Sequence, residues 1–288
     1  MIAVTGATGH TGGATAEALL KHNEAVRVIV RDAAKGEPWK GRGADVAVAS
    51  LDDIAALTRA LTGSCAAFLL LPPAYGAPDL LGAQRVVADA IAAAVKRSDV
   101  GHIVFLSSIG AQQSSGTGPI RALNYAEQQL RLSGKPLTLL RASYFIENWA
   151  AVLEAVRHKG ILPSFIPIDL PIEMIATTDI GEIAATLLRG AAPSGVEVVE
   201  IGGAAPLSPR ELAASLAGVI GRPVQAVDVP LDEVVPTFKG AGFSQNAAEL
   251  MREMYEGLAN GRVAYGDAAA PHRRGTRGPG DVLGPMLA

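Results

Sequence analysis

The first twenty residues, MIAVTGATGHTGGATAEALL (1–20), decide the fold of this chain. The apolar run at 2–5 is typical of a short buried strand, and a helical apolar pattern follows the last glycines. Between them, Gly6, Gly9 and Gly12 recur at every third residue. In a strand–turn–helix corner, the first glycine permits a tight reversal, the second leaves room for a pyrophosphate, and the third lets the helix approach the sheet.

The start of this helix is suited to an anion. The N–H groups of a first helical turn have no partner within the helix, so they favour a bound negative charge. Thr8, His10 and Thr11 can add side-chain donors. The stretch therefore predicts a dinucleotide site, and a tight turn with nothing bound is the alternative interpretation.

Apolar runs alternate with helical segments through the first half of the chain. Further strands are expected at 26–30, 44–50, 66–71, 102–108 and 137–143, and helices at 12–22, 54–61, 79–97 and 119–133. Strands that are apolar throughout, each followed by a helix, indicate a parallel sheet covered on both faces. Right-handed crossovers then make the fold an α/β, Rossmann-type, doubly wound sheet.

This alternation ends near residue 150. We expect an NAD(P)-binding Rossmann domain at 1–150 and a smaller C-terminal α+β domain, packed across the end of the sheet, at 151–288. The first domain can also take in part of 176–203, where a helix and the strand 196–203 are expected. A short strand near 224–230 and a helix at 244–258 complete the second half.

Several local features are also predicted. Capping boxes are expected at Ser50–Asp53, Asp179–Glu182 and Ser208–Glu211. Cys65 lies among apolar residues and is expected to be a buried thiol. The tail 271–281 is rich in Gly, Pro and Arg, and a mobile end is one of its interpretations.

Composition excludes several classes of function. The chain has 288 residues and a formal charge of −3, so no basic field points to nucleic acid. One cysteine excludes an internal disulfide, and no Cys/His spacing suggests a metal. No apolar run is long enough to span a membrane, and no signal segment precedes the first strand, so a cytoplasmic protein is expected.

The end of the second predicted strand bears on the choice of cofactor. A carboxylate there accepts hydrogen bonds from the adenosine ribose, whereas a guanidinium binds a 2′-phosphate. The strand ends in Arg31, and Asp32 follows. We expect NADP(H) in preference to NAD(H). In the alternative, Arg31 is a surface charge and Asp32 binds the ribose.

The chain resembles the NmrA-like family of atypical short-chain dehydrogenases. The motifs that carry this resemblance are TGATGHTGG (5–13), VIVRD (28–32), FLSSIGA (105–111), LTLLRASYFIENW (137–149) and TTDIGEIAATLL (177–188). The bacterial NAD(P)H:quinone oxidoreductase and triphenylmethane reductase types are nearest in pattern. The likeness covers nearly the whole chain, including RRGT at 273–276, which argues against a mobile tail.

The resemblance implies that the C-terminal domain, 151–288, forms a substrate cleft. It also implies a set of cofactor contacts at the ends of strands. These are the loop residues Gly6, Thr8, Gly9, His10, Thr11 and Gly12, then Arg31, Ser50, Leu71, Pro72, Pro73, Ser107, Ser108 and Asn124, with Ser143, Tyr144 and Phe145 beside the nicotinamide.

The sequence departs from the family pattern at two places. Relatives often have Gly-Asp-Leu after the third strand, where this chain has Ala-Ser-Leu at 49–51, so an adenine contact would come from Ser50 instead. Many relatives have His or Lys where this chain has Asn124. The Tyr-x-x-x-Lys pair of typical short-chain dehydrogenases is also absent, because the residue four positions after Tyr125 is Gln129.

The remaining chemistry is hydride transfer to an acceptor that stabilises charge itself, such as a quinone. Asn124 and Tyr144 are the candidate catalytic residues, and Asn148 can line the same face as Tyr144. Aromatic residues of the C-terminal half suit the wall of a cleft for a flat ligand: Phe238, Phe243, Tyr255 and Tyr265. The alternative is a non-enzymatic NADP(H) sensor that regulates a protein partner.

Overall fold

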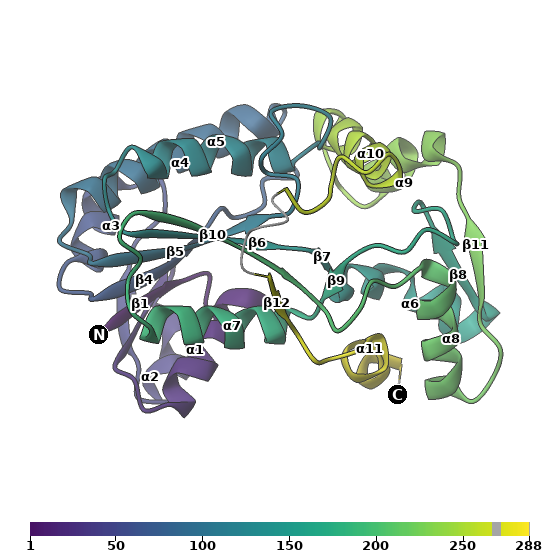
Figure 1. Ribbon diagram of the computed structural model, residues 1–288, viewed down its shortest axis with the longest axis horizontal. Coiled ribbons are helices and arrows are strands. Elements are labelled where there is room, and N and C mark those ends of the chain that lie inside the picture. Colours follow the sequence, from purple (N-terminus) through teal and green to yellow (C-terminus); the bar gives the residue numbers. More distant parts are fainter. Residues whose placement is uncertain (267–271, 288) are drawn as a thin grey trace.

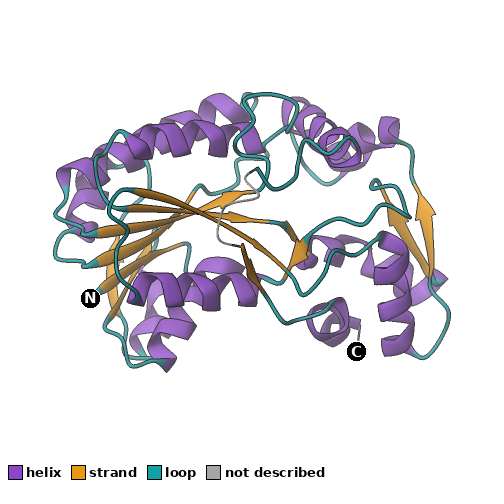
Figure 2. Ribbon diagram, viewed as in Figure 1, coloured by secondary structure: helices purple, strands orange, loops and turns teal. Residues whose placement is uncertain are grey.

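A parallel sheet forms the centre of the computed structural model, which describes residues 1–266 and 272–287. Its strands lie in the order β12-β10-β6-β5-β4-β1-β2-β3, and every neighbouring pair is parallel (Figures 1 and 2). They are β1 (Ile2–Thr5), β2 (Val26–Val30), β3 (Asp45–Val48), β4 (Ala66–Leu70), β5 (His102–Ser108), β6 (Leu137–Ala142), β10 (Val196–Gly202) and β12 (His272–Arg274).

Helices cover both faces of this sheet, which confirms the predicted doubly wound fold. One face packs against α1 (His10–Lys21) and α7 (Thr177–Arg189), and the other against α3 (Ile54–Leu61), α4 (Leu80–Arg97) and α5 (Ile120–Arg131). Successive strand residues point to opposite faces, so Val4 joins the first core and Ala3 the second. Both faces are apolar because both are buried.

Elements of the second half complete this layer. A Cβ atom at Gly181 of α7 would lie 2.5 Å from the Cβ of Ala14, so glycine allows α7 to pack directly on α1. Strand β10 pairs with β6, and β12 pairs with β10. The division into domains at 1–150 and 151–288 stays a prediction. Strands β10 and β12 are part of the central sheet, and α7 covers one of its faces.

The C-terminal half has its own apolar core, built around Trp149, Val156, Leu162, Leu216 and Leu283. Strand β11 pairs with β8, and β7 with β9, in two small sheets. The remaining elements are η1 (Ala33–Gly36), α2 (Glu37–Lys40), β7 (Tyr144–Phe145), η2 (Ile146–Val152), α6 (Leu153–Lys159), β8 (Ile161–Ser164), β9 (Met174–Ile175), α8 (Pro209–Ile220), β11 (Gln225–Asp228), η3 (Leu231–Glu233), α9 (Val234–Gly240), α10 (Gln245–Ala259) and α11 (Pro279–Leu287).

One of the three predicted capping boxes is confirmed. Ser208 and Glu211 cap α8 reciprocally, as the sequence indicates. The box at Ser50 is wrong, because Asp53 caps α3 through the N–H of Ala56 and Ser50 donates to Asp52. The box at Asp179 is also wrong.

Helix α7 starts two residues before Asp179, and the Asp179 carboxylate accepts from the N–H groups of Thr276 and Arg277 instead. The Arg277 guanidinium also contacts Asp179 and pairs with Glu182. The described part of the predicted tail, residues 272–281, contains β12 and the first residues of α11, and its contacts with Asp179 and Glu182 argue against a mobile end. Residue 271, the first of the predicted tail, lies outside the described residues.

The prediction for Cys65 is wrong. Its side chain is exposed, because the residue immediately precedes β4 at the amino edge of the sheet. The thiol donates to the carbonyl oxygen of Met1 at 3.2 Å. The apolar sequence around Cys65 reflects the strand that follows it, and that strand is buried.

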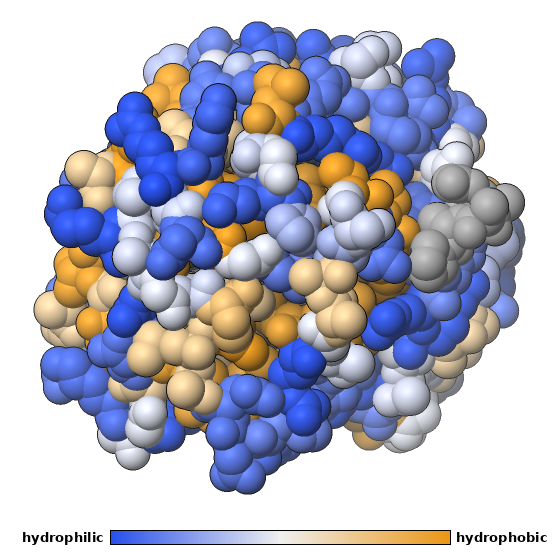
Figure 3. Space-filling view, turned by 60° about the vertical axis from the view of Figure 1, so that its left-hand side comes forward, coloured by the Kyte–Doolittle hydropathy of each residue, from blue (hydrophilic) through white to orange (hydrophobic). Residues whose placement is uncertain are grey.

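The surface shows apolar side chains in several separate places. Val48, Val86 and Leu132 are more than half exposed, and they come from β3, α4 and the end of α5. Figure 3 shows an area of hydrophobic residues across one face, with hydrophilic residues around it. Within residues 1–266 and 272–287, no helix is both long and apolar enough to cross a membrane.

Candidate functional site

The carboxyl edge of the sheet brings the predicted cofactor residues together. All the strands run in the same direction, so the residues that follow them meet at one edge. The predicted residues at this edge are those of the loop after β1, Arg31 after β2, Ser50 after β3, Leu71 to Pro73 after β4, the end of β5, and Ser143 after β6. The structure therefore gathers residues from six strands into one region.

The glycine corner, residues 6–12, has the geometry that its sequence predicts. Gly6 has φ +68°, which glycine adopts readily, and a Cβ there would lie 2.7 Å from Cδ2 of Leu70. A Cβ at Gly12 would lie 2.4 Å from the carbonyl carbon and oxygen of Gly6, so only glycine lets α1 approach so closely. A Cβ at Gly9 would have only the Gly6 oxygen nearby, at 3.5 Å.

The open side of this corner is the amino end of α1. Gly9 is the N-cap, no side chain caps the helix, and its first turn carries no acidic residue. Thr8 and His10 are exposed, whereas Thr11 is buried. Helix α1 begins at His10, two residues before the predicted start. The bare N–H groups and the absence of a carboxylate fit a phosphate group.

Arg31 and Asp32 have different local roles. Asp32 accepts a hydrogen bond from the N–H of Ala34 at 2.9 Å and so caps the short helix η1. Arg31 is exposed, and no hydrogen-bond or ion-pair partner is found for it among the described residues. The Arg31 guanidinium is free to bind a phosphate beside the glycine corner, whereas the Asp32 carboxylate is already used as a helix cap.

The predicted serines differ in what their hydroxyls contact. Ser107 donates to Oε1 of Glu127 at 2.6 Å, and Ser108 donates to the carbonyl oxygen of Ile109 at 2.9 Å. The hydroxyl of Ser143 is buried and has no partner in the described part of the chain. Ser143 is thus the serine whose hydrogen-bonding capacity is left for a ligand.

A buried ion pair lies below this edge, and sequence reasoning missed it. Arg141 donates to both oxygens of Glu127, at 2.9 and 2.7 Å, and both side chains are almost fully buried. Glu200, with no exposed surface, lies 3.9 Å from Arg141. Burial acts to lower the pKa of Arg141, but the hydrogen bonds and charges of Glu127 and Glu200 outweigh it and raise that pKa.

Asn124 lies on α5, and its amide is already engaged. Nδ2 donates to the carbonyl oxygen of Ala111 at 2.7 Å, and Oδ1 accepts from Gln128 at 2.9 Å. These bonds hold the turn that follows β5, at the same edge of the sheet. The structure therefore gives Asn124 a role in positioning that turn.

An aromatic cluster at this edge joins residues of both halves of the chain. We use this name for Tyr75, Tyr144, Phe165, Phe238, Phe243 and Tyr255: five of these rings are linked by ring contacts, and Tyr144 joins them through its hydroxyl. The hydroxyls of Tyr144 and Tyr255 are 3.3 Å apart. Burial raises the pKa of both phenols, so both stay protonated at neutral pH.

The predicted aromatic wall is present in part. Phe238, Phe243 and Tyr255 belong to the cluster, whereas the ring of Tyr265 lies 4.6 Å from that of His272. Asn148 is exposed on η2, and a hydrogen bond from it acts to lower the pKa of Tyr144. Tyr75 and Phe165 were not among the predicted residues.

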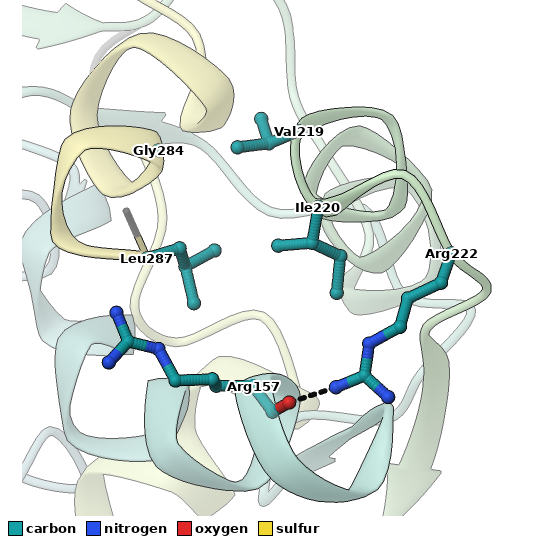
Figure 4. A pocket seen from close by; sticks show the side chains of 6 residues that line it. All are labelled: Arg157, Val219, Ile220, Arg222, Gly284 and Leu287. Atoms are coloured by element: carbon teal, nitrogen blue, oxygen red, sulfur yellow. Dashed lines mark hydrogen bonds between the residues drawn. The ribbon is translucent and has the colours of Figure 1, made fainter.

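Two cavities in the C-terminal half lie away from these groups. One, of about 300 Å³, is lined by Arg157, Val219, Ile220, Arg222, Gly284 and Leu287, from α6, α8, α11 and the turn after α8 (Figure 4). There Arg222 donates to the carbonyl oxygen of Arg157. The other, of about 320 Å³, is lined by residues of α10. No predicted site residue is among the described residues that line them.

Comparisons with known proteins show which family and which relatives this chain resembles. A model of the NmrA-like family matches residues 1–268. NAD(P)H azoreductase of Xenophilus azovorans is 30% identical over 257 residues, which cover 88% of this chain and 86% of that protein. Quinone oxidoreductase 2 of Escherichia coli is 29% identical over 265 residues, with coverage of 91% and 89%.

Two solved structures share the fold of this chain. The NADPH-dependent quinone oxidoreductase of Escherichia coli, complexed with NADPH, superposes with a TM-score of 0.80 at 27% identity, covering 93% of this chain and 92% of that one. The triphenylmethane reductase of Citrobacter sp., complexed with NADP(H), has the same fold, with a TM-score of 0.80 at 21% identity and coverage of 99% and 95%.

Proposed function

The chain belongs to the NmrA-like family, and on this premise we propose that it is an NADP(H)-dependent oxidoreductase that reduces quinone-like or other conjugated small molecules. The observation that carries the proposal is the uncapped amino end of α1 beside the unpaired Arg31. The names of the azoreductase and of the quinone oxidoreductase support the same class of reaction.

The residues present fit the cofactor. Gly9 leaves space where a larger side chain would stand, and the N–H groups of the first turn of α1 would hold the diphosphate. Arg31 would bind the 2′-phosphate, and Ser143 would offer its unpartnered hydroxyl on the nicotinamide side. When bound, the cofactor supplies hydride.

The protein's own part in the reaction is orientation. A conjugated acceptor spreads the incoming charge over its π system, so a strong protein acid is not required, and holding the reactants in contact supplies much of the rate. Tyr144 and Tyr255 are protonated and can donate to an acceptor oxygen. Asn124 holds the turn after β5 in place.

The test is the oxidation of NADPH, followed by its absorbance, with a panel of quinones, azo dyes and enones. We expect turnover with at least one acceptor. Gly9→Ala should lower NADPH affinity about tenfold, because a methyl group enters the space left for the phosphates. Wild-type protein that binds NADPH tightly but oxidises it with no acceptor would contradict the proposal and favour the sensor.

A further inference from the structure

We propose that the ring of Tyr75 occupies the acceptor subsite, and that a flat, neutral quinonoid ring takes its place on Phe243 with one oxygen towards the hydroxyls of Tyr144 and Tyr255. This rests on the proposed function, because it names the place and the chemical class of the acceptor. The residues that carry it come from the loop after β4 and from the aromatic cluster.

The contact between the Tyr75 and Phe243 rings has the geometry that a flat ligand would adopt on Phe243. The rings of Tyr75 and Phe243 are stacked, with centroids 4.4 Å apart and planes inclined by 18°. Phe238 meets Phe243 edge to face at 4.9 Å, which fixes the orientation of the surface beneath. Offset stacking of this kind is the favoured geometry for two flat π systems.

The hydroxyl of Tyr75 marks where a ligand oxygen would lie. Burial raises the pKa of the Tyr75 phenol, as it does those of Tyr144 and Tyr255, so its hydroxyl end belongs to the buried side of the aromatic cluster. The hydroxyls of Tyr144 and Tyr255 form a hydrogen-bonded pair, 3.3 Å apart, and Asn148 also hydrogen-bonds Tyr144. The ring of Tyr255 contacts Phe238, which packs edge to face on Phe243. A phenol stacked on Phe243 in the same cluster resembles a bound hydroquinone.

Tyr75 is attached in a way that allows it to leave. Its backbone oxygen accepts from the N–H of Ser244 at 2.9 Å, which anchors the main chain of the loop. Tyr75 is the most exposed residue of the cluster, at 39%, although burial of its phenol end raises the pKa of the hydroxyl. The next residue is Gly76, which has nothing within 4 Å of its Cβ position, so no neighbouring atom packs against the chain on that side.

The composition of the subsite specifies the ligand. The six members of the aromatic cluster are uncharged, so a charged ring would lose its hydration without gaining a partner there. A neutral ring with a carbonyl oxygen gains stacking on Phe243 and a hydrogen bond from the phenol pair. Quinones have both features.

The experiment measures binding of 2,3-dimethyl-1,4-naphthoquinone by calorimetry, in the absence of NADPH. Both thiol-reactive ring positions of this probe are blocked, which matters because Cys65 is exposed. In Tyr75→Ala we expect the dissociation constant to fall about threefold to tenfold, because the competing side chain is removed. Tyr75→Phe, the matched control, keeps the ring in place and should bind within about twofold of wild type.

A second variant tests the surface beneath. Phe243→Leu, added to Tyr75→Ala, should raise the dissociation constant at least back to the wild-type value, because the stacking partner is lost. Circular dichroism checks that the double variant is folded. An unchanged or higher dissociation constant in Tyr75→Ala would overturn the inference, since Tyr75 would then be a wall of the site.

The two proposals fail separately. If the wild type oxidises NADPH with quinones while Tyr75→Ala binds the probe no better, the subsite is wrong and the proposed function stands. If Tyr75→Ala binds the probe more tightly and no acceptor is ever reduced, the subsite stands and the proposed function is wrong.

Discussion

The glycine corner and the aromatic cluster lie at the same edge of the sheet, yet they are built in opposite ways. The corner is seven consecutive residues, 6–12, whose working groups are backbone N–H atoms. The cluster takes six side chains from positions between 75 and 255. A site made of backbone needs only the right local turn, whereas a site made of side chains exists only once distant elements have packed.

The largest effect should come from removing the support that both regions share. Arg141 lies on β6, just before Ser143 and Tyr144, and pairs with Glu127, which also holds Ser107. Arg141→Met leaves the buried carboxylate of Glu127 without its cation and removes the nearby charge of Arg141 from Glu200. We expect a loss of about 3–5 kcal/mol in the free energy of unfolding, measured by urea denaturation.

The matched control is Arg121→Met. Arg121 pairs with Glu253 at 3.4 Å, but both side chains are roughly a third exposed, so the loss should stay below about 1 kcal/mol. Equal losses in the two variants would show that burial of the Arg141 pair has no special weight.

The glycine corner can be broken at two positions with different outcomes. Gly12→Ala places a Cβ 2.4 Å from backbone atoms of Gly6 and should lower stability by about 1–3 kcal/mol. Gly9→Ala meets only one atom, at 3.5 Å, and its backbone is extended, so its stability should change by less than about 0.5 kcal/mol.

Thermal unfolding and NADPH titration of both variants distinguish these roles. We expect Gly9→Ala to unfold like the wild type while it binds NADPH more weakly. A Gly9→Ala variant with normal affinity would mean that its open space is not where the phosphates bind.

The preference for NADPH over NADH tests the role of Arg31 beside the glycine corner. Arg31→Asp should lower the preference for NADPH over NADH by about tenfold or more, because a carboxylate would face the 2′-phosphate. The measurement is the ratio of the two dissociation constants. Arg59→Asp, an exchange of the same charge on α3, is the control and should leave the ratio unchanged.

The smallest effect concerns the aromatic cluster at high pH. Burial raises the pKa of Tyr144 well above its ordinary value near 10, so the unfolded chain loses this proton first. The contribution of protonated Tyr144 to the free energy of unfolding should therefore be complete below about pH 10, and the free energy of unfolding should fall as the pH rises further. Tyr144→Phe should flatten this decline in urea denaturation between pH 8 and 11, and parallel curves would contradict it.

The sequence predicts the corner better than the cluster for the same physical reason. The spacing of Gly6, Gly9 and Gly12 and the apolar strands determine the sheet and its carboxyl edge, because these are local patterns. The pairing of Glu127 with Arg141 and the stacking of Tyr75 on Phe243 join residues far apart in the chain. No periodicity or capping rule specifies such contacts.

The pairing of β12 with β10 has a consequence for how the protein is made. Residues 272–274 form one outer strand of the sheet. Just after them, the N–H of Thr276 donates to Asp179 of α7. During synthesis, the unpaired side of β10 therefore stays uncovered until almost the whole chain has been translated. Nascent or truncated chains that end before residue 272 would present this strand to one another and aggregate through it.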